Sequence, residues 1–224
     1  PRMSDFTPWF LYRSALAAVR RLQKMGRSFD VIDAHYFYPD GVAAALLGRA
    51  LRIPVVITGR GSDLTLISRH PLAGRRIRWA ISEASVVVAV CEDLRRHLLR
   101  LGADARHSVT LRNGVDLDHF SPGNRAAARA ALGLKRFTLL SVGALIRRKG
   151  HHIVIKTLAN LPDCDLLIAG SGPLRRKLEC LAVRAGVADR VRFLGEVRHA
   201  ALADIYRAAD IMVLMSDREG WANV

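Results

Sequence analysis

The sequence predicts an α/β protein made of doubly wound parallel sheets, and two observations carry this prediction. Short apolar runs rich in Val, Ile and Leu recur along the 224 residues, and segments with helical periodicity separate most of them. Near-continuous apolar strands alternating with helices are typical of parallel sheets covered on both faces. The runs lie at residues 31–35, 54–58, 85–90, 108–111, 137–142, 165–169, 191–194 and 211–215.

The spacing of apolar residues predicts helices between these strands. In residues 173–186, Leu174, Leu178 and Leu181 follow one another in steps of four and three. Such steps place the three side chains on one helix face. The run at 211–215 is expected to be the last buried strand, and the loop after it is expected to contain Glu219 and Gly220.

The alternation of strand and helix breaks once, between residues 111 and 137. Asn113-Gly114 and Pro122-Gly123 are loop signals, and residues 124–134 read as a short helix capped by Asn124. The strand at 137–142 then begins a second sheet. We therefore expect two domains, 1–120 and 121–224. The first residue is not Met and the chain ends one step past a strand, so both domains are expected to be incomplete.

The composition favours an anionic partner and a reducing compartment. Lys plus Arg total 35 against 20 for Asp plus Glu, a net charge of +15. Nucleic acid, anionic lipid and phosphorylated small molecules are all compatible with this charge. The cysteines Cys91, Cys164 and Cys180 are odd in number and widely spaced, which argues for a cytoplasmic location and against a disulfide framework or zinc site. No apolar run is long enough to span a membrane.

Basic residues cluster at the strand-to-helix junctions, where parallel sheets bind ligands. The strand at 54–58 leads into Gly59, Arg60, Gly61 and Asp63. The strand at 137–142 leads through Gly143 to Arg147-Arg148-Lys149, and the next leads through Gly172 to Arg175-Arg176-Lys177. Cations in a first helical turn oppose the helix dipole, and a bound anion such as a diphosphate would reverse that cost.

One helical segment is a candidate for lipid binding. In residues 10–27, Arg13, Arg20, Lys24 and Arg27 share one face and apolar side chains lie opposite. An ordinary domain helix with a solvated basic side explains this pattern. Peripheral docking on an anionic membrane surface is the alternative.

Several stretches together resemble the retaining glycosyltransferases of family 4, also called glycosyl transferase group 1. They are "LRNGVDLDHFSP", "SVGALIRRKGHH", "LLIAGSGPLRRKLECLA", "VRFLGEV" and "IYRAADIMVLMSDREGWANV". They occur in the family's order across residues 30–224. The resemblance implies a GT-B fold of two Rossmann-like domains. It also implies transfer of a sugar, with retention, from a nucleotide-diphospho-sugar to an acceptor hydroxyl in polysaccharide or glycolipid biosynthesis.

The resemblance also implies roles for individual residues of the second domain. Lys149 would bind the donor diphosphate, with Gly143 in the same loop, and Glu219 would hold the transferred sugar as the first glutamate of the family's E-x(7)-E pair. The second glutamate is expected beyond residue 224. The other implied donor contacts are Gly172 and the turn Phe193, Leu194 and Gly195, followed by Gly220 and the amides of Trp221, Ala222 and Asn223.

The sequence departs from the family in both domains. Where members commonly carry Arg in the loop after strand 137–142, this chain has Ala144, so Arg147 or Arg148 would substitute. Many members have His in the first-domain turn, where this chain has Arg60. The candidates on the acceptor side are Arg60, Asp63 and His35.

No cofactor and no metal are expected, because cations and helix N-termini can stabilise the leaving diphosphate. Two D-x-D pairs, Asp116–Asp118 and Asp163–Asp165, lie in an interdomain motif and at a strand start, which does not favour a metal role. The expected partners are a nucleotide-diphospho-sugar and a sugar or lipid-linked acceptor. The alternatives are another GT-B enzyme, such as a sugar-nucleotide epimerase or phosphorylase, and a basic nucleic-acid-binding protein. Only 6% of the residues are aromatic, which disfavours the last.

Overall fold

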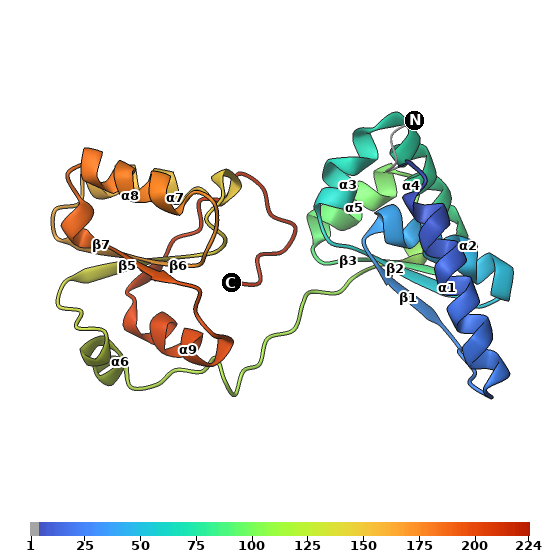
Figure 1. The fold of residues 1–224 in the computed structure, drawn as a ribbon, viewed down its shortest axis with the longest axis horizontal. Coiled ribbons are helices and arrows are strands. Elements are labelled where there is room, and N and C mark those ends of the chain that lie inside the picture. Colours follow the sequence, from blue (N-terminus) through green and yellow to red (C-terminus); the bar gives the residue numbers. More distant parts are fainter. Residues whose placement is uncertain (1–4) are drawn as a thin grey trace. The chain divides into compact units, whose positions relative to one another are not determined.

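The computed structural model describes residues 5–224 and divides the chain into two compact units. Unit 1 holds the residues up to Asn113 together with Gly220–Asn223, and unit 2 holds Gly114–Glu219 and Val224. Each unit contains one four-stranded sheet whose strands pair in parallel. The predicted fold class, α/β with two parallel sheets, is therefore confirmed (Figure 1).

Unit 1 alternates helices and strands in the order expected from its apolar runs. Its sheet has the strand order β1-β2-β3-β4. The strands are Ile32–His35 (β1), Val55–Gly59 (β2), Val86–Ala89 (β3) and Ser108–Thr110 (β4), and the helices are Thr7–Lys24 (α1), Val42–Leu51 (α2), Ser62–Thr65 (α3), Pro71–Glu83 (α4) and Glu92–Arg100 (α5).

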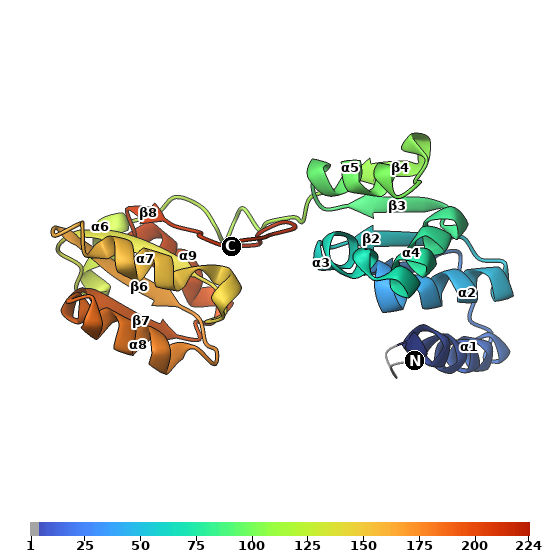
Figure 2. The ribbon, with the colours of Figure 1, turned by 90° about the horizontal axis from the view of Figure 1, so that it is seen from above.

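The core of unit 1 forms between its sheet and α2, α4 and α5. Ile57 of β2 and Ala89 of β3 are fully buried there, against Ile77 of α4 and Leu98 of α5. Each Ile or Leu side chain contributes roughly 1.5–3 kcal/mol when removed from water. Helix α1 lies beside α2 (Figure 2). The core holds the carboxyl ends of the strands in place, which is where the candidate residues lie.

Unit 2 has the strand order β7-β6-β5-β8 and helices on both faces of its sheet. Figure 1 shows α7 and α8 on one face and α6 and α9 on the other. A separate apolar cluster fills each side. The strands are Phe137–Val142 (β5), Cys164–Ala169 (β6), Val191–Gly195 (β7) and Ile211–Met212 (β8), and the helices are Arg125–Ala131 (α6), His151–Leu158 (α7), Arg175–Arg184 (α8) and His199–Ala208 (α9).

The prediction that residues 211–215 form a buried strand is wrong. Strand β8 covers only two residues, Ile211 and Met212, which are 51% and 39% exposed. The physical reason is their place in the sheet: β8 pairs only with β5, at one edge. Val213 is partly buried against the core. The part of the apolar run that packs against the core is therefore shorter than the run itself.

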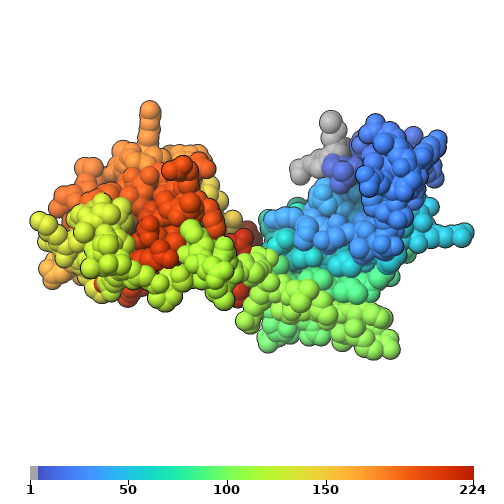
Figure 3. Space-filling model, turned by 90° about the horizontal axis from the view of Figure 1, so that it is seen from below, coloured from blue at the N-terminus to red at the C-terminus, as the bar shows by residue number. Residues whose placement is uncertain are grey.

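The start of unit 2 is anchored along α9, as Figure 3 shows for the yellow-green residues that lie against the red ones. The Arg207 guanidinium donates to the backbone oxygens of His119 and Ser121, at 3.1 and 2.9 Å. Asn124 then caps α6, since its side-chain oxygen accepts from the Ala127 N–H at 2.9 Å. The predicted cap is confirmed.

Helix α1 has the predicted basic face, and its apolar side is only partly buried, since Leu11 is 38% exposed. Arg13, Arg20 and Lys24 are exposed, whereas Ala15 and Val19 are half-buried. Arg27, expected to extend the basic face, lies beyond the helix end at Lys24. Among residues 5–224, no helix combines the length and the apolar character needed to cross a bilayer.

Candidate functional site

In unit 2, the loop after β5 carries Lys149 at the carboxyl end of the sheet. A 3-10 turn spans Arg147–Lys149, and Gly150 then adopts a left-handed conformation with φ of 70° before α7 begins. A Cβ at Gly150 would overlap the backbone oxygen of Met215, so only glycine lets the loops after β5 and β8 approach this closely. Lys149 folds back over Gly143, where an added Cβ would lie 3.4 Å from its Cδ.

The loop after β6 packs directly on the loop after β5. The Leu145 N–H donates to the Ser171 oxygen at 2.8 Å, and the Leu174 N–H donates back to the Leu145 oxygen at 3.0 Å. A Cβ at Gly172 would lie only 2.8 Å from the Leu145 backbone, so this glycine is needed for close packing. The two glycine-containing junctions singled out in the sequence thus form one continuous surface.

The last residues of β7 adjoin the same surface. Gly195 accepts a hydrogen bond at 2.6 Å from the Gly170 N–H through its backbone oxygen. Phe193 and Leu194 are partly buried on opposite sides of the sheet, in different apolar clusters. The Arg175 guanidinium lies 4.7 Å from the centre of the Phe193 ring. Phe193–Gly195, predicted as a turn, are the last residues of strand β7, and the structure brings them next to the loop that contains Gly172.

Glu219 reaches this surface from the loop after β8. Its Oε1 accepts from the Lys149 Nζ at 2.5 Å, and its Oε2 lies 3.6 Å from the Arg148 guanidinium. Burial alone would raise the pKa of Glu219. The hydrogen bond from Lys149 and the positive charges of Lys149 and Arg148 outweigh burial and hold the pKa of Glu219 below its usual value. The carboxylate is therefore ionised at neutral pH.

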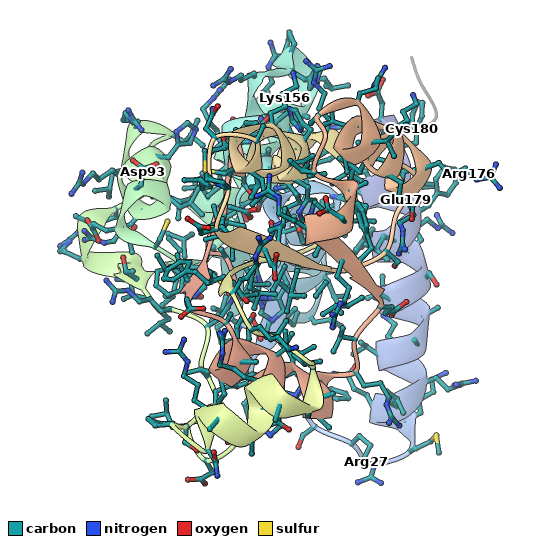
Figure 4. All side chains as sticks on the ribbon, turned by 90° about the vertical axis from the view of Figure 1, so that its left-hand side faces the viewer. Arg27, Asp93, Lys156, Arg176, Glu179 and Cys180 are labelled. Carbon is teal, nitrogen blue, oxygen red and sulfur yellow. The ribbon has the colours of Figure 1, made fainter. Side chains whose placement is uncertain are left out.

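The structure distinguishes the basic residues that the sequence grouped together. Arg148 faces Glu219 and donates to the Arg218 backbone oxygen at 2.9 Å. Arg147 is exposed, and its side chain has no ion pair or hydrogen bond within residues 5–224. Arg175 forms an ion pair with Glu179, and Arg176 extends away from α8 (Figure 4). Of these arginines, Arg148 lies beside the candidate residues Lys149 and Glu219.

Residues 220–223 group with unit 1 and contain no helix. A Cβ at Gly220 would overlap the Arg60 backbone oxygen, and the Arg112 guanidinium lies 5.3 Å from the Trp221 ring centre. Asn223 accepts a hydrogen bond at 2.6 Å from the Asn113 side chain. The predicted contacts of the amides of Trp221, Ala222 and Asn223 with a sugar stay a prediction.

In unit 1, Asp63 organises the turn after β2. Its fully buried carboxylate accepts hydrogen bonds from three backbone N–H groups: Phe37 at 2.9 Å, Gly61 at 2.8 Å and Arg60 at 3.2 Å. A carboxylate with these partners fixes the loop geometry rather than facing a ligand. The candidate Asp63 therefore serves the turn itself.

The Arg60 side chain spans the carboxyl ends of two strands. It donates to the Asn113 side-chain oxygen at 2.7 Å and to Nδ1 of His35 at 3.0 Å. An accepting Nδ1 places the proton of neutral His35 on Nε2, which lies 3.4 Å from Asp33. Within residues 5–224, no carboxylate lies within ion-pair distance of Arg60. The structure thus brings His35 and Arg60 together and adds Asn113, which sequence reasoning missed although it lies in a quoted motif.

Neither D-x-D pair forms a metal site in the part of the chain that the structure describes. Asp116 accepts from the N–H groups of Asp118 and His119 and so closes a turn. Across residues 5–224, no three His, Cys, Asp or Glu side chains gather in an arrangement that could hold a metal ion.

Curated relatives share sequence similarity across most of the chain. A D-inositol 3-phosphate glycosyltransferase from Geodermatophilus obscurus is 31% identical over 220 residues, covering 88% of this chain and 49% of that protein. The enzyme of the same name from Mycobacterium bovis is also 31% identical, over 88% of this chain and 44% of its own. The chain therefore spans about half the length of these relatives.

Solved structures share the fold of this chain. Sucrose-phosphate synthase from Thermosynechococcus elongatus has a TM-score of 0.77 and 25% identity, covering all of this chain and 58% of its own. HepE from Anabaena, solved with UDP, has a TM-score of 0.75 and 23% identity, covering 90% and 56%.

Two family models match the chain in succession. The model of glycosyltransferase family 4 matches residues 1–119, more than half of the sequence. The model of glycosyl transferases group 1 matches residues 124–224. Together with the strand-end geometry, these matches show that the chain belongs to the glycosyltransferases of family 4, group 1, with the GT-B fold.

Proposed function

We propose that unit 2 binds a nucleotide-diphospho-sugar and that its sugar is transferred, with retention, to a hydroxyl of an acceptor held by unit 1. The observation that carries this proposal is the Lys149–Glu219 pair, which lies where the loops after β5 and β8 meet. A cation for the diphosphate and a carboxylate for sugar hydroxyls stand side by side. Because the chain spans only part of its relatives, the proposal concerns the whole protein.

The chemistry follows from charge development on the leaving group. Breaking the glycosidic bond places negative charge on the diphosphate, and preorganised cations stabilise it without reorganising. Lys149 and Arg148 supply this charge from one loop, and Lys149 is only 14% exposed, so water screens it weakly. Glu219 accepts hydrogen bonds from sugar hydroxyls and thereby orients the sugar.

The acceptor class is proposed from the cluster in unit 1. Arg60 is held by neutral groups, so its charge is available to an anionic acceptor. Relatives named for D-inositol 3-phosphate make a phosphorylated polyol the first acceptor to try. A lipid-linked or polysaccharide intermediate fits the same site if it carries an anionic group near the reacting hydroxyl.

We also propose peripheral binding of α1 to an anionic membrane surface in the cytoplasm. Exposed Arg13, Arg20 and Lys24 supply charge, and Phe6 and Phe10 are 50% and 61% exposed near the start of the same helix. Basic residues near such a surface contribute about 1 kcal/mol each. Co-sedimentation with phosphatidylglycerol vesicles, but not with phosphatidylcholine vesicles, is the expected result.

The deciding experiment measures donor use by the whole enzyme. The protein is incubated with a panel of UDP-, GDP- and ADP-sugars and an inositol phosphate acceptor, and released nucleotide is measured. UDP-sugars are the first choice, because HepE was solved with UDP. NMR of the product should show that the anomeric configuration of the donor is retained, and an inverted configuration would refute retention.

The same assay separates the alternatives. An epimerase would convert the nucleotide sugar into its epimer without an acceptor. A phosphorylase would require inorganic phosphate instead of the acceptor hydroxyl. A nucleic-acid-binding protein would release no nucleotide and would shift mixed-sequence DNA or RNA in a salt-dependent manner.

A further inference from the structure

The side-chain amide of Asn113 is hydrogen-bonded at both ends, and the function proposed above gives this residue no role. Asn113 follows strand β4 and lies where the chain leaves unit 1. Its Oδ1 accepts from the Arg60 Nη1 at 2.7 Å, and its Nδ2 donates to the Asn223 Oδ1 at 2.6 Å. A guanidinium can only donate, so the amide oxygen must face Arg60. The partners of Asn113 therefore fix the orientation of its amide.

The backbone of Arg60 is fixed independently of Asn113. The Arg60 N–H donates to the buried Asp63 carboxylate at 3.2 Å. On the other side, a Cβ at Gly220 would overlap the Arg60 backbone oxygen, so these two chain segments are in direct contact. Only the side-chain torsions of Arg60 are then left to decide where its guanidinium points.

The Arg60 guanidinium is held between two neutral groups and still has unused donors. It carries five N–H groups. One donates to Asn113 and one to the Nδ1 of His35, so three have no partner within residues 5–224. A planar guanidinium binds an oxyanion through two parallel N–H···O bonds. Arg60 is thus arranged to receive a phosphate or carboxylate group.

Fixing the guanidinium in advance strengthens the binding of an anion. An Arg side chain loses much conformational entropy when it is ordered, and a ligand that must order a free Arg binds more weakly by that amount. An amide suits this task better than a carboxylate. An Asp in place of Asn113 could hold the same guanidinium, but its charge would neutralise Arg60 and repel an incoming anion. The residue type at position 113 therefore favours a positioning role.

We propose that Asn113 is a positioning residue that aims the Arg60 guanidinium at the anionic group of the acceptor. The inference rests on the function proposed for unit 1, and it narrows the acceptor to hydroxyl compounds that carry a phosphate or carboxylate group. Asn113 acts through Arg60 and does not contact the acceptor.

Two substitutions separate positioning from support of the fold. Asn113→Ala frees the Arg60 side chain, whereas Asn113→Asp keeps the shape of the residue and an oxygen for Arg60 but adds a negative charge. If Asn113 served only the fold, Asn113→Asp would be the milder change. We expect Asn113→Ala to bind inorganic phosphate at Arg60 about three- to tenfold more weakly than the unsubstituted protein, the cost of ordering one Arg side chain. Asn113→Asp should bind it at least about threefold more weakly again, because its carboxylate competes for the same cation.

The measurement is a titration of the whole protein with inorganic phosphate, followed at the Arg60 Nε–H resonance by ¹H–¹⁵N NMR. The resonance is assigned with Arg60→Lys. Asn160→Ala, at an exposed asparagine of unit 2, is the matched control and should not change the affinity. Calorimetric titration with UDP should give affinities within about twofold in all variants, since Lys149 is unaltered.

An Asn113→Asp variant that binds phosphate as tightly as Asn113→Ala, or an Arg60 resonance that does not respond to phosphate, would overturn the inference. If an Asn113 variant fails to fold, the Asn113 side-chain amide of the unsubstituted protein decides. Its ¹⁵N resonance should move in step with that of Arg60 during the titration, and an unchanged resonance would refute the link. If neither UDP, GDP nor ADP binds the unsubstituted protein, the proposed function itself fails, and the phosphate titration still decides the role of Asn113.

Discussion

Lys149 and Glu219, predicted to hold different parts of one donor, bind each other at 2.5 Å in the structure. Their side chains are 14% and 22% exposed, so the pair is partly shielded from water. In the structure the Glu219 carboxylate occupies the position beside the Lys149 Nζ where the donor diphosphate is proposed to bind. A donor that binds must therefore exchange one anionic partner of Lys149 for another.

Substituting Glu219→Gln should change the affinities for nucleotide and nucleotide sugar differently. Removing the competing carboxylate should strengthen binding of UDP by about threefold to tenfold. This is the change in affinity expected from losing an ion pair worth about 1 kcal/mol. Binding of a UDP-sugar should gain less, because the sugar loses a carboxylate acceptor. Calorimetric titration of both ligands measures the difference. Weaker UDP binding by the folded variant would show that Glu219 does not compete for Lys149.

Substituting Lys149→Ala should weaken binding of the nucleotide diphosphate. A charge-assisted contact to phosphate is worth about 1.5–3 kcal/mol, so the affinity should fall about 10- to 100-fold. Lys156→Ala is a suitable control, because this exposed lysine lies on α7, the next helix along the chain (Figure 4). An unchanged affinity in a folded Lys149→Ala variant, with a loss in Arg148→Ala, would assign the contact to Arg148.

The strands could be predicted from the sequence because burial on both faces leaves a pattern that is local in the chain. Each apolar run corresponds to a strand, and the Asn124 cap follows from neighbouring residues. The exposure of Ile211 and Met212 could not be predicted, because strand order within a sheet depends on distant pairing. Composition and hydropathy do not distinguish an edge strand from a central one.

The candidate site was predicted in part, and mainly through resemblance to a family. The nearness of Lys149 and Glu219 depends on the meeting of two loops 70 residues apart, which no local pattern records. The role of Asp63 depends on the Phe37 N–H, 26 residues away. Nothing in the sequence shows that His151 is buried and the adjacent His152 half-buried.

Removal of divalent metals should leave the activity of the whole enzyme intact. The cations beside Glu219 can neutralise the diphosphate, and both D-x-D pairs lie in contexts that do not favour a metal role. Nucleotide release should be the same in excess EDTA as in manganese or magnesium. Activity that disappears with EDTA and returns with either metal would show that the leaving diphosphate needs a metal ion.

Substituting Asp63→Ala should strongly destabilise unit 1. The change leaves three backbone N–H groups of the turn without their acceptor, and hydrogen bonds to a charged group are worth about 1.5–3 kcal/mol each. We expect a loss of at least about 3 kcal/mol in the free energy of unfolding, with a smaller loss for Asp63→Asn, which keeps one acceptor. Urea unfolding followed by circular dichroism measures both. Losses below about 1 kcal/mol would show that water replaces the carboxylate.

Asp210 should make the stability of unit 2 depend on pH in the acid range. Its carboxylate accepts from the Thr138 N–H at 2.8 Å and from Arg129 at 2.9 Å, and it also pairs with Arg125, so it ties α6 to the start of β5. Burial alone would raise the pKa of Asp210. The hydrogen bonds from Thr138, Arg125 and Arg129 outweigh burial and hold the pKa below the ordinary value of 3.8.

The lowered pKa fixes the direction of the pH dependence. In the unfolded chain Asp210 takes up a proton near its ordinary pKa, whereas in the folded chain it does so only at lower pH. Its contribution is therefore fully present well above pH 3.8 and is lost as the pH falls through the lowered value. The difference in unfolding free energy between the unsubstituted protein and Asp210→Asn should stay constant from pH 7 down to about pH 5. It should then shrink steadily as the pH falls through 3.8 toward the lowered pKa of the folded chain. Asp163→Asn, which changes an exposed aspartate of the same unit, should show no such trend in parallel urea titrations. A difference for Asp210→Asn that stays constant over this range would mean that the carboxylate ties α6 to the sheet through its shape and hydrogen-bonding geometry rather than through its charge.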